Sequence, residues 1–445
     1  MAREYKDSGI EWIGKIPKEW EVVKLRNLGS FSASGIDKKI VEGEELVHIV
    51  NYVDVYNNNT KELRVGDYMV VSAPLDKCQE HQLCVGDMIY TPSSETIEDI
   101  GLSSVVMDEL PNTAYSYHVI RFRTNDEIYL KYKKYLTNNH VCLNYFSSCA
   151  TGSIRKTLSR EIFKECKVLL PPLSAQQKIA DYLDKVCGEV DELISLQETM
   201  IEELKAYKQS VITEAVTKGL NPNVPMTDSG IDWIGEIPEQ WKLEPLKYCF
   251  GRRSEKNNPV KTEERLSLSI DKGVTLYAEK TTNLDRFKDD FTQYQLAYPN
   301  DIVLNCMNMI VGAVGLSNYM GCVSPVYYVI YPIRQDINPL YYSYLLNIPT
   351  IRGVYYSLGK GIYAIERGEG RVNTCRLKVA YNDFGRLEIP VPPLKEQKKI
   401  TQFIQQKCSE IDSLIALKQA KIEELKEYKK SVIYEYVTGK KEVGG

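Results

Sequence analysis

The stretch from Pro171 to Gly219 reads PPLSAQQKIADYLDKVCGEVDELISLQETMIEELKAYKQSVITEAVTKG. Its two prolines suit a first helical turn, Ser174 is a candidate N-cap, and Gly219 is a candidate end. Between them there is no further proline, and Gly188 is the only glycine. Apolar residues recur at alternating steps of four and three residues, which is the heptad pattern of a coiled coil. The stretch predicts one helix, roughly 65 Å long, that needs a partner helix to bury its apolar seam.

The chain supplies that partner near its end. Residues Pro392 to Lys440 read PPLKEQKKITQFIQQKCSEIDSLIALKQAKIEELKEYKKSVIYEYVTGK, the same segment displaced by 221 positions. Such a repeat decides the architecture before any local detail does. We predict that the two helices pair through their apolar seams. The predicted seam residues are Ile179, Leu183, Val186, Val190, Leu193, Leu204 and Val211 in the first helix, and Ile400, Ile404, Ile411, Leu414, Leu425 and Val432 in the second.

A second repeat opens each half of the chain. DSGIEWIGKIPKEW at residues 7–20 returns as DSGIDWIGEIPEQW at residues 228–241, again 221 positions later. Gly and Pro punctuate both copies, which predicts turn-rich leads that tryptophans pin to a core. Each half therefore runs from lead to globular region to long helix. The predicted segments are 1–170 for the first domain, 171–220 for the first helix, 221–391 for the second domain and 392–445 for the second helix.

The two globular stretches predict domains of one mixed, mostly β fold. Short runs rich in Val, Ile, Tyr and Phe alternate with turn residues, which favours strands, and residues 126–138 and 339–346 are the candidate helices. The fold class is therefore α+β, with a pseudo-twofold internal repeat. The loops of the two domains differ in length and content. Because loops carry recognition while the scaffold is kept, we expect two related but different binding tasks.

Composition and charge narrow the class of protein. Of 445 residues, 26% are charged and 43% hydrophobic, and the net charge is −4, so nucleic acid would be bound only through local patches. Residues 21–172 hold seventeen Lys and Arg against twenty Asp and Glu (net −3), whereas residues 242–393 hold nineteen against fifteen (net +4). Eleven cysteines without a CxxC pair, no signal-peptide pattern and no bilayer-length apolar run predict a soluble, cytoplasmic protein.

Basic segments approach each long helix. In the first half the segment is residues 151–160, TGSIRKTLSR, and in the second Lys360, Arg367, Arg371 and Arg376 are interleaved with glycines. Glycine lets a backbone come close to a ligand, and arginine binds phosphate or guanine edges through two hydrogen bonds. An ordinary solvated loop is the alternative interpretation. For Arg155 and Arg376, which are 221 positions apart, a shared structural role near the helix start is equally compatible.

Motifs of catalysis are missing from the sequence. Cys78, His81 and Cys84 offer three metal ligands without a fourth, and structural zinc usually has four, so no metal is predicted. All four histidines lie in the first half, which excludes a catalytic histidine common to both repeats. No phosphate-binding loop, dinucleotide fingerprint, amino-methyltransferase motif or nucleophile elbow is present. The sequence predicts a protein that is not an enzyme, with no catalytic residue.

With both repeats laid out, the chain resembles the specificity (S) subunit of type I restriction–modification systems. The likeness spans the full length and is carried by three motifs, each present twice and in the same order. They are the lead Asp-Ser-Gly-Ile-x-Trp-Ile-Gly-x-Ile-Pro-x-x-Trp, the helix start Pro-Pro-Leu-x-x-Gln, and the helix run Ile-Glu-Glu-Leu-Lys-x-Tyr-Lys-x-Ser-Val-Ile.

The resemblance implies a DNA-binding role without an active site. It implies two target-recognition domains that each read one half of a split sequence in double-stranded DNA, and two helices paired antiparallel as a coiled-coil spacer. It also implies two modification subunits and restriction (translocase) subunits as partners; S-adenosylmethionine, ATP and Mg would be bound by those partners and no cofactor by this chain. The candidate DNA contacts are Thr91, Ser93, Ser94, Thr151, Ser153, Arg155, Lys156, Asn305, Asn308, Lys360, Arg367, Arg371 and Arg376.

Three other interpretations remain open at this point. A stand-alone DNA methyltransferase would need its own pocket for S-adenosylmethionine. A non-DNA scaffold built on a duplicated coiled coil would bind no split DNA sequence. A specificity protein of a fused or type IIB-like system would keep the family and change its partners.

Overall fold

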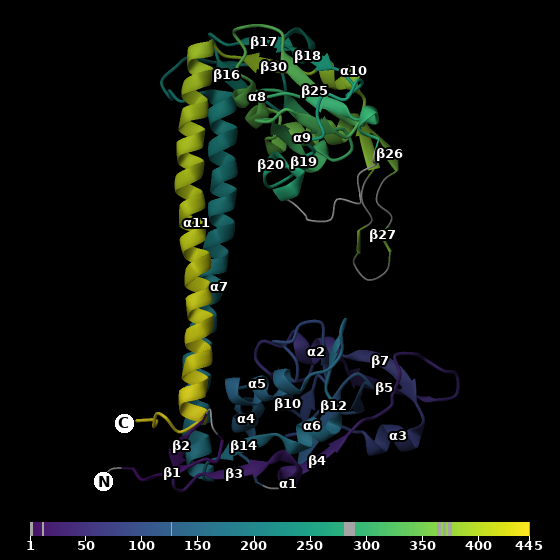
Figure 1. Ribbon diagram of the computed structural model, residues 1–445, viewed down its shortest axis with the longest axis vertical. Helices are drawn as coiled ribbons and strands as arrows, with labels where there is room; N and C mark the ends of the chain where they lie inside the picture. The colour runs from purple at the N-terminus through teal and green to yellow at the C-terminus, as the bar shows by residue number, and fades with distance from the viewer. Residues whose placement is uncertain are drawn as a thin grey trace. The chain divides into compact units, whose positions relative to one another are not determined.

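The computed structural model describes residues 3–10, 13–125, 127–279, 290–362, 366–367, 371–372 and 376–444. The chain divides into two compact units (Figure 1). Unit 1 comprises Met1–Glu198 and Gln419–Gly445, and unit 2 comprises Thr199–Lys418. Each unit therefore combines one globular region with parts of both long helices. Neither unit corresponds to one half of the sequence repeat.

The globular region of unit 1 is built on two sheets with the strand orders β4-β12-β8-β10-β6 and β11-β5-β7. The pairs β1-β2, β14-β3 and β13-β9 flank them. The strands are β1 (Tyr5–Asp7), β2 (Lys15–Pro17), β3 (Glu21–Lys24), β4 (Gly29–Ser32), β5 (Glu45–Val50), β6 (Glu62–Leu63), β7 (Met69–Ala73), β8 (Met88–Tyr90), β9 (Ser93–Ser94), β10 (Ser103–Val106), β11 (Thr113–Tyr115), β12 (Ile120–Thr124), β13 (Lys156–Thr157) and β14 (Lys167–Leu170).

Short helices cover this sheet and close its core. They are α1 (Leu25–Leu28), α2 (Tyr52–Tyr56), α3 (Leu75–Glu80), η1 (Leu130–Tyr132), α4 (Lys133–Thr137), α5 (His140–Cys149) and α6 (Arg160–Glu165). The core is aromatic: the ring of Phe31 lies 4.4 Å from that of Phe122, and Phe163 lies 5.0 Å from Phe146. Offset and tilted rings at these distances add to the free energy gained by burying them.

The globular region of unit 2 is built on a four-stranded sheet of order β18-β25-β22-β23, with six further strand pairs around it. The strands are β15 (Met226–Asp228), β16 (Glu236–Pro238), β17 (Lys242–Pro245), β18 (Phe250–Arg253), β19 (Leu266–Ser269), β20 (Gly273–Leu276), β21 (Gln295–Ala297), β22 (Ile302–Asn305), β23 (Val314–Leu316), β24 (Gly321–Val323), β25 (Tyr327–Pro332), β26 (Gly359–Ile362), β27 (Glu366–Arg367), β28 (Arg371–Val372), β29 (Arg376–Val379) and β30 (Glu388–Val391). The helices are η2 (Leu246–Tyr248), η3 (Tyr277–Glu279), η4 (Phe291–Gln293), η5 (Met309–Val311), α8 (Pro339–Leu345), α9 (Pro349–Leu358) and α10 (Tyr381–Gly385).

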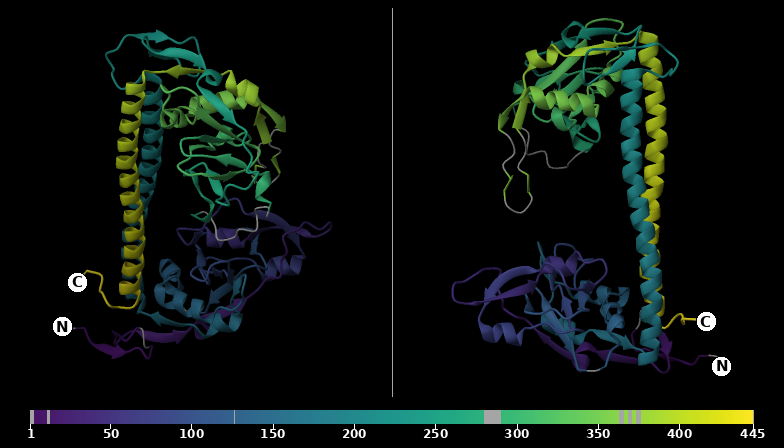
Figure 2. Two further views of the ribbon diagram at one scale, coloured as in Figure 1. Left: turned by 45° about the horizontal axis from the view of Figure 1, so that its top comes forward. Right: turned by 180° about the vertical axis from the view of Figure 1, so that it is seen from behind.

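Both long helices are present, as α7 (Leu173–Lys218) and α11 (Leu394–Val437). In unit 1 the ring of Tyr182 lies 4.5 Å from that of Tyr436, and the Lys429 ammonium lies 2.7 Å from the Asp191 carboxylate. Residue numbers rise along α7 as they fall along α11, so the two helix segments are antiparallel in this unit. The views in Figure 2 show the two ribbons side by side.

The same arrangement holds inside unit 2. The Lys208 ammonium lies 2.7 Å from the Asp412 carboxylate, and that of Lys418 lies 3.1 Å from the sulfur of Met200. The segments of α7 and α11 within this unit therefore also run antiparallel. Adding 221 to Asp191 and Lys208 gives Asp412 and Lys429, so the two inter-helix ion pairs are copies of each other.

The predicted seam residues differ in burial. Ile179, Leu183, Val190, Ile400, Ile404, Ile411 and Val432 are buried, and Val186, Leu204, Val211 and Leu425 are partly buried. Leu193 and Leu414 are instead 47% and 48% exposed, so placing them in the seam was wrong. A straight helix drifts by about 20° per heptad against a strict seven-residue repeat. The buried face of each helix has therefore rotated relative to the predicted seam. Eight residues after each exposed leucine, Ile201 in α7 and Ile422 in α11 are buried instead.

A buried glutamine fixes the start of each long helix. Gln397, fully buried, accepts a hydrogen bond at Oε1 from the Asn338 N–H (2.7 Å) and donates from Nε2 to the carbonyls of Asp336 (2.9 Å) and Pro392 (2.7 Å). In unit 1, Gln176 likewise accepts from the backbone of the globular region and donates to the carbonyl at the helix start. The glutamine of the Pro-Pro-Leu-x-x-Gln motif therefore ties each helix to its neighbouring domain.

Replacing Gln397 with methionine should lower the free energy of unfolding by about 3 kcal/mol, because three backbone groups lose their hydrogen bonds to this buried side chain. Denaturant unfolding of the full chain, followed by circular dichroism, measures this. Gln405→Met is the matched control, since Gln405 is exposed on the same helix and its loss should change stability by less than about 0.5 kcal/mol. Equal stability of the two variants would contradict the anchoring role.

A glycine just beyond the end of each long helix packs against a lead. Gly439 has φ +69°, and a Cβ there would lie 2.5 Å from Cδ of Pro17 and 3.2 Å from the ring of Trp20. Gly219 has φ +76°, and a Cβ there would lie 3.3 Å from the ring of Trp241. A left-handed glycine is the common end of a helix, and here it also admits the tryptophan. The lead of each half therefore packs on the helix that belongs to the other half.

Candidate nucleic-acid interface

In unit 1 the structure brings together two segments that the sequence analysis singled out. Strands β9 and β13 pair antiparallel, with Ser94 opposite Lys156 and Ser93 opposite Thr157. Backbone hydrogen bonds between Thr151 and Thr157 close the hairpin of residues 151–157. Ile154 at its tip is 92% exposed, so the hairpin projects into solvent. An exposed, hydrogen-bonded hairpin can enter a groove of DNA without further folding cost.

The Arg155 side chain lies over an aromatic ring. Its guanidinium carbon lies 5.5 Å from the centre of the Tyr52 ring, and Tyr52 stacks on Tyr56 at 5.2 Å. The Tyr56 hydroxyl in turn donates to Asp99 at 3.0 Å. A guanidinium over an aromatic face is oriented yet keeps its N–H donors for phosphate or base edges. Tyr52 and Tyr56, in α2, were missed by the sequence analysis because about a hundred residues separate them from Arg155.

A histidine borders the same surface. The ring of His118 lies 3.8 Å from that of Tyr117 and is partly buried. Burial lowers the pKa of His118, and the charges of Lys38 and Arg155 lower it further. At neutral pH the imidazole is therefore neutral and can both donate and accept a hydrogen bond, as a base edge requires.

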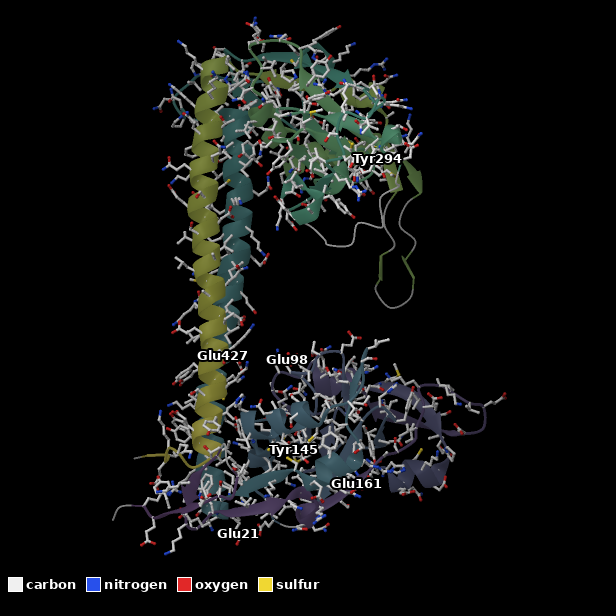
Figure 3. All side chains as sticks on the ribbon, in the orientation of Figure 1. Glu21, Glu98, Tyr145, Glu161, Tyr294 and Glu427 are labelled. Carbon is white, nitrogen blue, oxygen red and sulfur yellow. The ribbon has the colours of Figure 1, made fainter. Side chains whose placement is uncertain are left out.

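Two residues predicted as DNA contacts in unit 1 are buried, and the prediction was wrong for their side chains. Thr91 is fully buried, and both its N–H (2.9 Å) and its hydroxyl (3.2 Å) donate to the Leu102 carbonyl. Ser94 is 1% exposed and accepts the Thr96 N–H at 3.2 Å. They shape the loop of residues 95–99, which carries the Glu98 labelled in Figure 3, rather than reach beyond it.

The other candidates of unit 1 lie at the surface. Ser93 and Lys156 are partly buried, and Thr151, Ser153 and Arg155 are exposed. The Lys156 ammonium donates to the Gly152 carbonyl at 2.8 Å and so stabilises the hairpin. The exposed members of this group stay predictions as DNA contacts.

In unit 2 the candidates gather around strands β22, β26 and β29. Asn308 is exposed, whereas Asn305 is partly buried and accepts the Met307 N–H at 3.1 Å. Lys360 is exposed, lies 4.0 Å from Asp383 and is opposite Lys378 in the β26–β29 register. Arg367, Arg371 and Arg376 lie in β27, β28 and β29, with Arg367 opposite Arg371, but their side chains lie outside the described residues.

Arg252 is a basic residue of unit 2 that the sequence analysis missed. Its exposed guanidinium lies 5.1 Å from the centre of the Tyr328 ring and 4.8 Å from that of Tyr381. Its neighbour Arg253 instead pairs with the nearly buried Asp301 at 2.6 Å. Successive residues of a strand point to opposite faces, so one arginine of the pair supports the fold and the other is presented to solvent. The sequence signal was this doublet, but nothing local tells which arginine is presented.

Unit 1 and unit 2 therefore each present an arginine on aromatic rings. Arg155 lies over Tyr52 in the first, and Arg252 lies between Tyr328 and Tyr381 in the second. Among the described residues no group of three or more His, Cys, Asp or Glu side chains could hold a metal ion. In the part of the chain that the structure describes, no helix has the length and apolar character needed to span a membrane.

The amino-acid sequence is similar to known specificity subunits over nearly its full length. A family model described as the type I restriction modification DNA specificity domain matches residues 17–206 and 247–427. The putative type I restriction enzyme MjaX specificity subunit of Methanocaldococcus jannaschii is 23% identical over 458 aligned positions, covering 99% of this chain and 98% of that protein. The type I restriction enzyme MjaVIII specificity subunit of the same organism is 22% identical, covering 96% and 94%.

The fold is also found among solved structures. A chain from work described as the structural basis underlying complex assembly and conformational transition of the type I R-M system superposes with a TM-score of 0.65. It is 14% identical in sequence, and the superposition covers 95% of this chain and 99% of that chain. At this identity the likeness concerns the fold.

Proposed function

The chain belongs to the type I restriction modification DNA specificity family, and from that premise we propose that it reads a split DNA sequence and scaffolds its partner subunits. It is a specificity subunit, the non-catalytic DNA-recognition component of such a system. The observation that carries the proposal is the double match of the family model, once in each half of the chain. Two unlike recognition domains suit a target made of two different half-sites.

The two surfaces described above suggest how DNA is bound. Arginines 155 and 252 are oriented by stacking and exposed, so each can bind a phosphate or the O6 and N7 atoms of guanine. Unit 1 has acidic neighbours at Asp99 and Glu95, which favours hydrogen-bonded recognition there over attraction by net charge. In unit 2 the net positive charge of residues 242–393 adds a sequence-independent attraction to the phosphates.

The paired helices are proposed to act as an antiparallel coiled-coil spacer with pseudo-twofold symmetry. The repeated ion pairs Asp191–Lys429 and Asp412–Lys208, each at 2.7 Å, support this symmetry. An internal twofold relation would present the same docking surface twice, which suits two copies of a modification subunit. We propose that these modification subunits carry S-adenosylmethionine, that restriction subunits carry ATP and Mg, and that this chain carries no cofactor.

The proposal is tested by mapping methylated adenines in a host that expresses this chain together with its modification subunit. The expected result is two short specified blocks around a fixed gap, one block for each recognition domain. Methylation without a split pattern would contradict the proposal. Duplex binding with such a pattern would also exclude a non-DNA scaffold, and failure of the isolated chain to bind S-adenosylmethionine would exclude a stand-alone methyltransferase.

Replacing Arg155 or Arg252 with alanine should weaken specific binding by the assembled methyltransferase by about 1–3 kcal/mol if the arginine contacts a base. If it contacts a phosphate, binding should weaken equally for all sequences, and the slope of affinity against salt should fall by about one. Fluorescence anisotropy with specific and scrambled duplexes measures both. Lys6→Ala is the control, because Lys6 is exposed but lies in β1, next to the lead of residues 7–20. Unchanged affinity would show that the substituted arginine does not contact DNA.

The corresponding test for the arginines of β27 and β28 is the double substitution Arg367→Ala with Arg371→Ala.

A further inference from the structure

Unit 1 contains a pocket that DNA recognition leaves without a role. It has a volume of about 400 Å³, within the roughly 300–1,000 Å³ typical of small-molecule sites. One side is formed by residues 59–62 and by helices α4 and α5 of the recognition domain. The other side is formed by α7 at Asp184–Asp191 and by Lys429 and Ile433 of α11. An occupant would therefore touch the recognition domain and both long helices of this unit at once.

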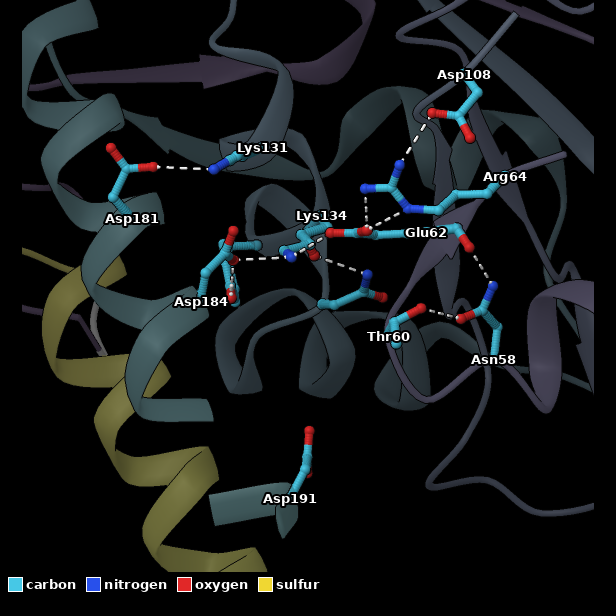
Figure 4. Close-up of polar contacts among 12 residues, drawn as sticks. Asn58, Thr60, Glu62, Arg64, Asp108, Lys131, Lys134, Asp181, Asp184 and Asp191 are labelled. Atoms are coloured by element: carbon cyan, nitrogen blue, oxygen red, sulfur yellow. Dashed lines mark hydrogen bonds and ion pairs between the residues drawn. The ribbon is translucent and has the colours of Figure 1, made fainter. Parts of the chain in front are cut away.

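The carboxylates that line this pocket are already paired. Glu62 lies 2.6 Å from the Lys134 ammonium, which also lies 2.8 Å from Asp184 (Figure 4). The Tyr135 hydroxyl donates to Asp184 at 2.6 Å, and Asp191 pairs with Lys429 at 2.7 Å. The paired groups satisfy one another and leave no anion that needs a cationic ligand.

Lys61 differs from these groups. It lines the pocket and is partly buried, and among the described residues no carboxylate lies within ion-pair distance of its ammonium. Burial lowers the pKa of Lys61, and the charge of Lys429 contributes to the lowering, against the opposing effect of Asp99. Its backbone has φ 58°, a strained conformation for a side chain with a Cβ. A partly desolvated cation without a partner is stabilised when an anion binds beside it.

A glycine that has no packing role lines the same pocket. Gly188 lines the pocket in the interior of α7, where a glycine costs about 1 kcal/mol relative to alanine. A Cβ at this position would meet nothing within 4 Å, so packing does not require the glycine. The equivalent position of α11 is Ser409, so the repeat itself does not require it either. The remaining wall combines the polar Asn59 and Thr60 with the apolar Leu102, Leu143 and Ile433.

We propose that this pocket binds a small organic phosphate, with the phosphate beside Lys61 and its organic part over the wall at Gly188. The volume exceeds what a bare phosphate ion would fill, and the mixed wall suits a sugar- or nucleoside-sized body. Because the ligand contacts the domain and the helices together, binding stabilises their packing in unit 1 by mass action. None of the residues that line the pocket is among the candidate DNA contacts, so the site would exist whether or not the chain reads a split sequence.

The experiment uses the full chain without DNA or partner subunits and titrates adenosine monophosphate, glycerol phosphate and inorganic phosphate by calorimetry and thermal unfolding. At least one organic phosphate is expected to bind and to raise the melting temperature. Lys61→Met should weaken binding at least about tenfold, the loss of one ion pair in a partly buried site. Gly188→Gln should abolish binding by filling the pocket, whereas Gly188→Ala should retain it.

Two results would overturn the proposal. One is that no probe binds at millimolar concentration. The other is that Lys61→Met and Gly188→Gln bind a probe as tightly as the parent chain, because the probe then sits elsewhere. Since Gly188→Ala and Gly188→Gln both replace a helical glycine at an open position, both should fold, and a difference between them reports on the pocket alone.

Discussion

An insertion of seven residues after Thr199 in α7 alone is expected to abolish methylation by the assembled complex. Helix α7 pairs with α11 through its residues before 199 in unit 1 and through its later residues in unit 2. Both helices are unbroken across this boundary. A heptad lengthens one helix by about 10 Å, so the helices can no longer satisfy both pairings. Methylation mapping, with sedimentation of the complex, measures the loss.

The matched variant carries a second heptad after Ala420 in α11, the position 221 residues later. The two helices are then equally long again, and both sets of inter-helix contacts can form. Methylation should return, with a gap between the specified blocks that is wider by about three base pairs, since about 10 Å corresponds to three rises of 3.4 Å. An unchanged gap in the double variant, or full activity in the single one, would remove the spacer role.

The helices were the most predictable part of this fold. The predicted segment 171–220 is helical from Leu173 to Lys218, because prolines and a glycine mark its ends and the 221-residue repeat supplies a second copy to compare. Of the candidate helix 126–138, the structure has helix from Leu130 to Thr137, while Asp126 lies outside the described residues. Helices of this kind are specified by the local spacing of apolar residues and by end signals, and both can be read directly from the sequence.

Contacts between segments that are far apart in the chain could not be predicted from the sequence. The Lys440 ammonium donates to the carbonyls of Ile13 (2.6 Å) and Lys15 (2.9 Å), at the far end of the chain. The same limit applies to the interface, where Arg155 stacks on Tyr52. Thr91 and Ser94, which were predicted as DNA contacts, are buried, because strand register decides which side chains face the core. Segments could thus be predicted, and individual side chains could not.

The exposed leucines of the long helices define two equivalent surfaces. Unit 1 presents Leu193 and Leu196 of α7, and unit 2 presents Leu414 and Leu417 of α11, 221 positions later; all four are about half exposed or more. A tyrosine from the opposite helix is exposed in each unit as well, Tyr428 in unit 1 and Tyr207 in unit 2. Apolar side chains exposed in pairs at helical spacing are typical of a partner-binding face. We expect each face to bind one modification subunit.

Replacing both leucines of one face with glutamine should remove one modification subunit, and replacing all four should remove both. Each leucine anchor is worth about 1–2 kcal/mol, so a face without its pair should bind roughly a hundredfold more weakly. Native mass spectrometry of the chain with its modification subunit should then give two bound copies for the parent, one for either double variant and none for the quadruple variant.

Leu75→Gln is the control, because Leu75 is also exposed but lies in α3. Stability should change little, since all these side chains already contact water. If the Leu193/Leu196 and Leu414/Leu417 variants differ in the number of copies they retain, the two faces are not equivalent, and the twofold arrangement of partners is wrong.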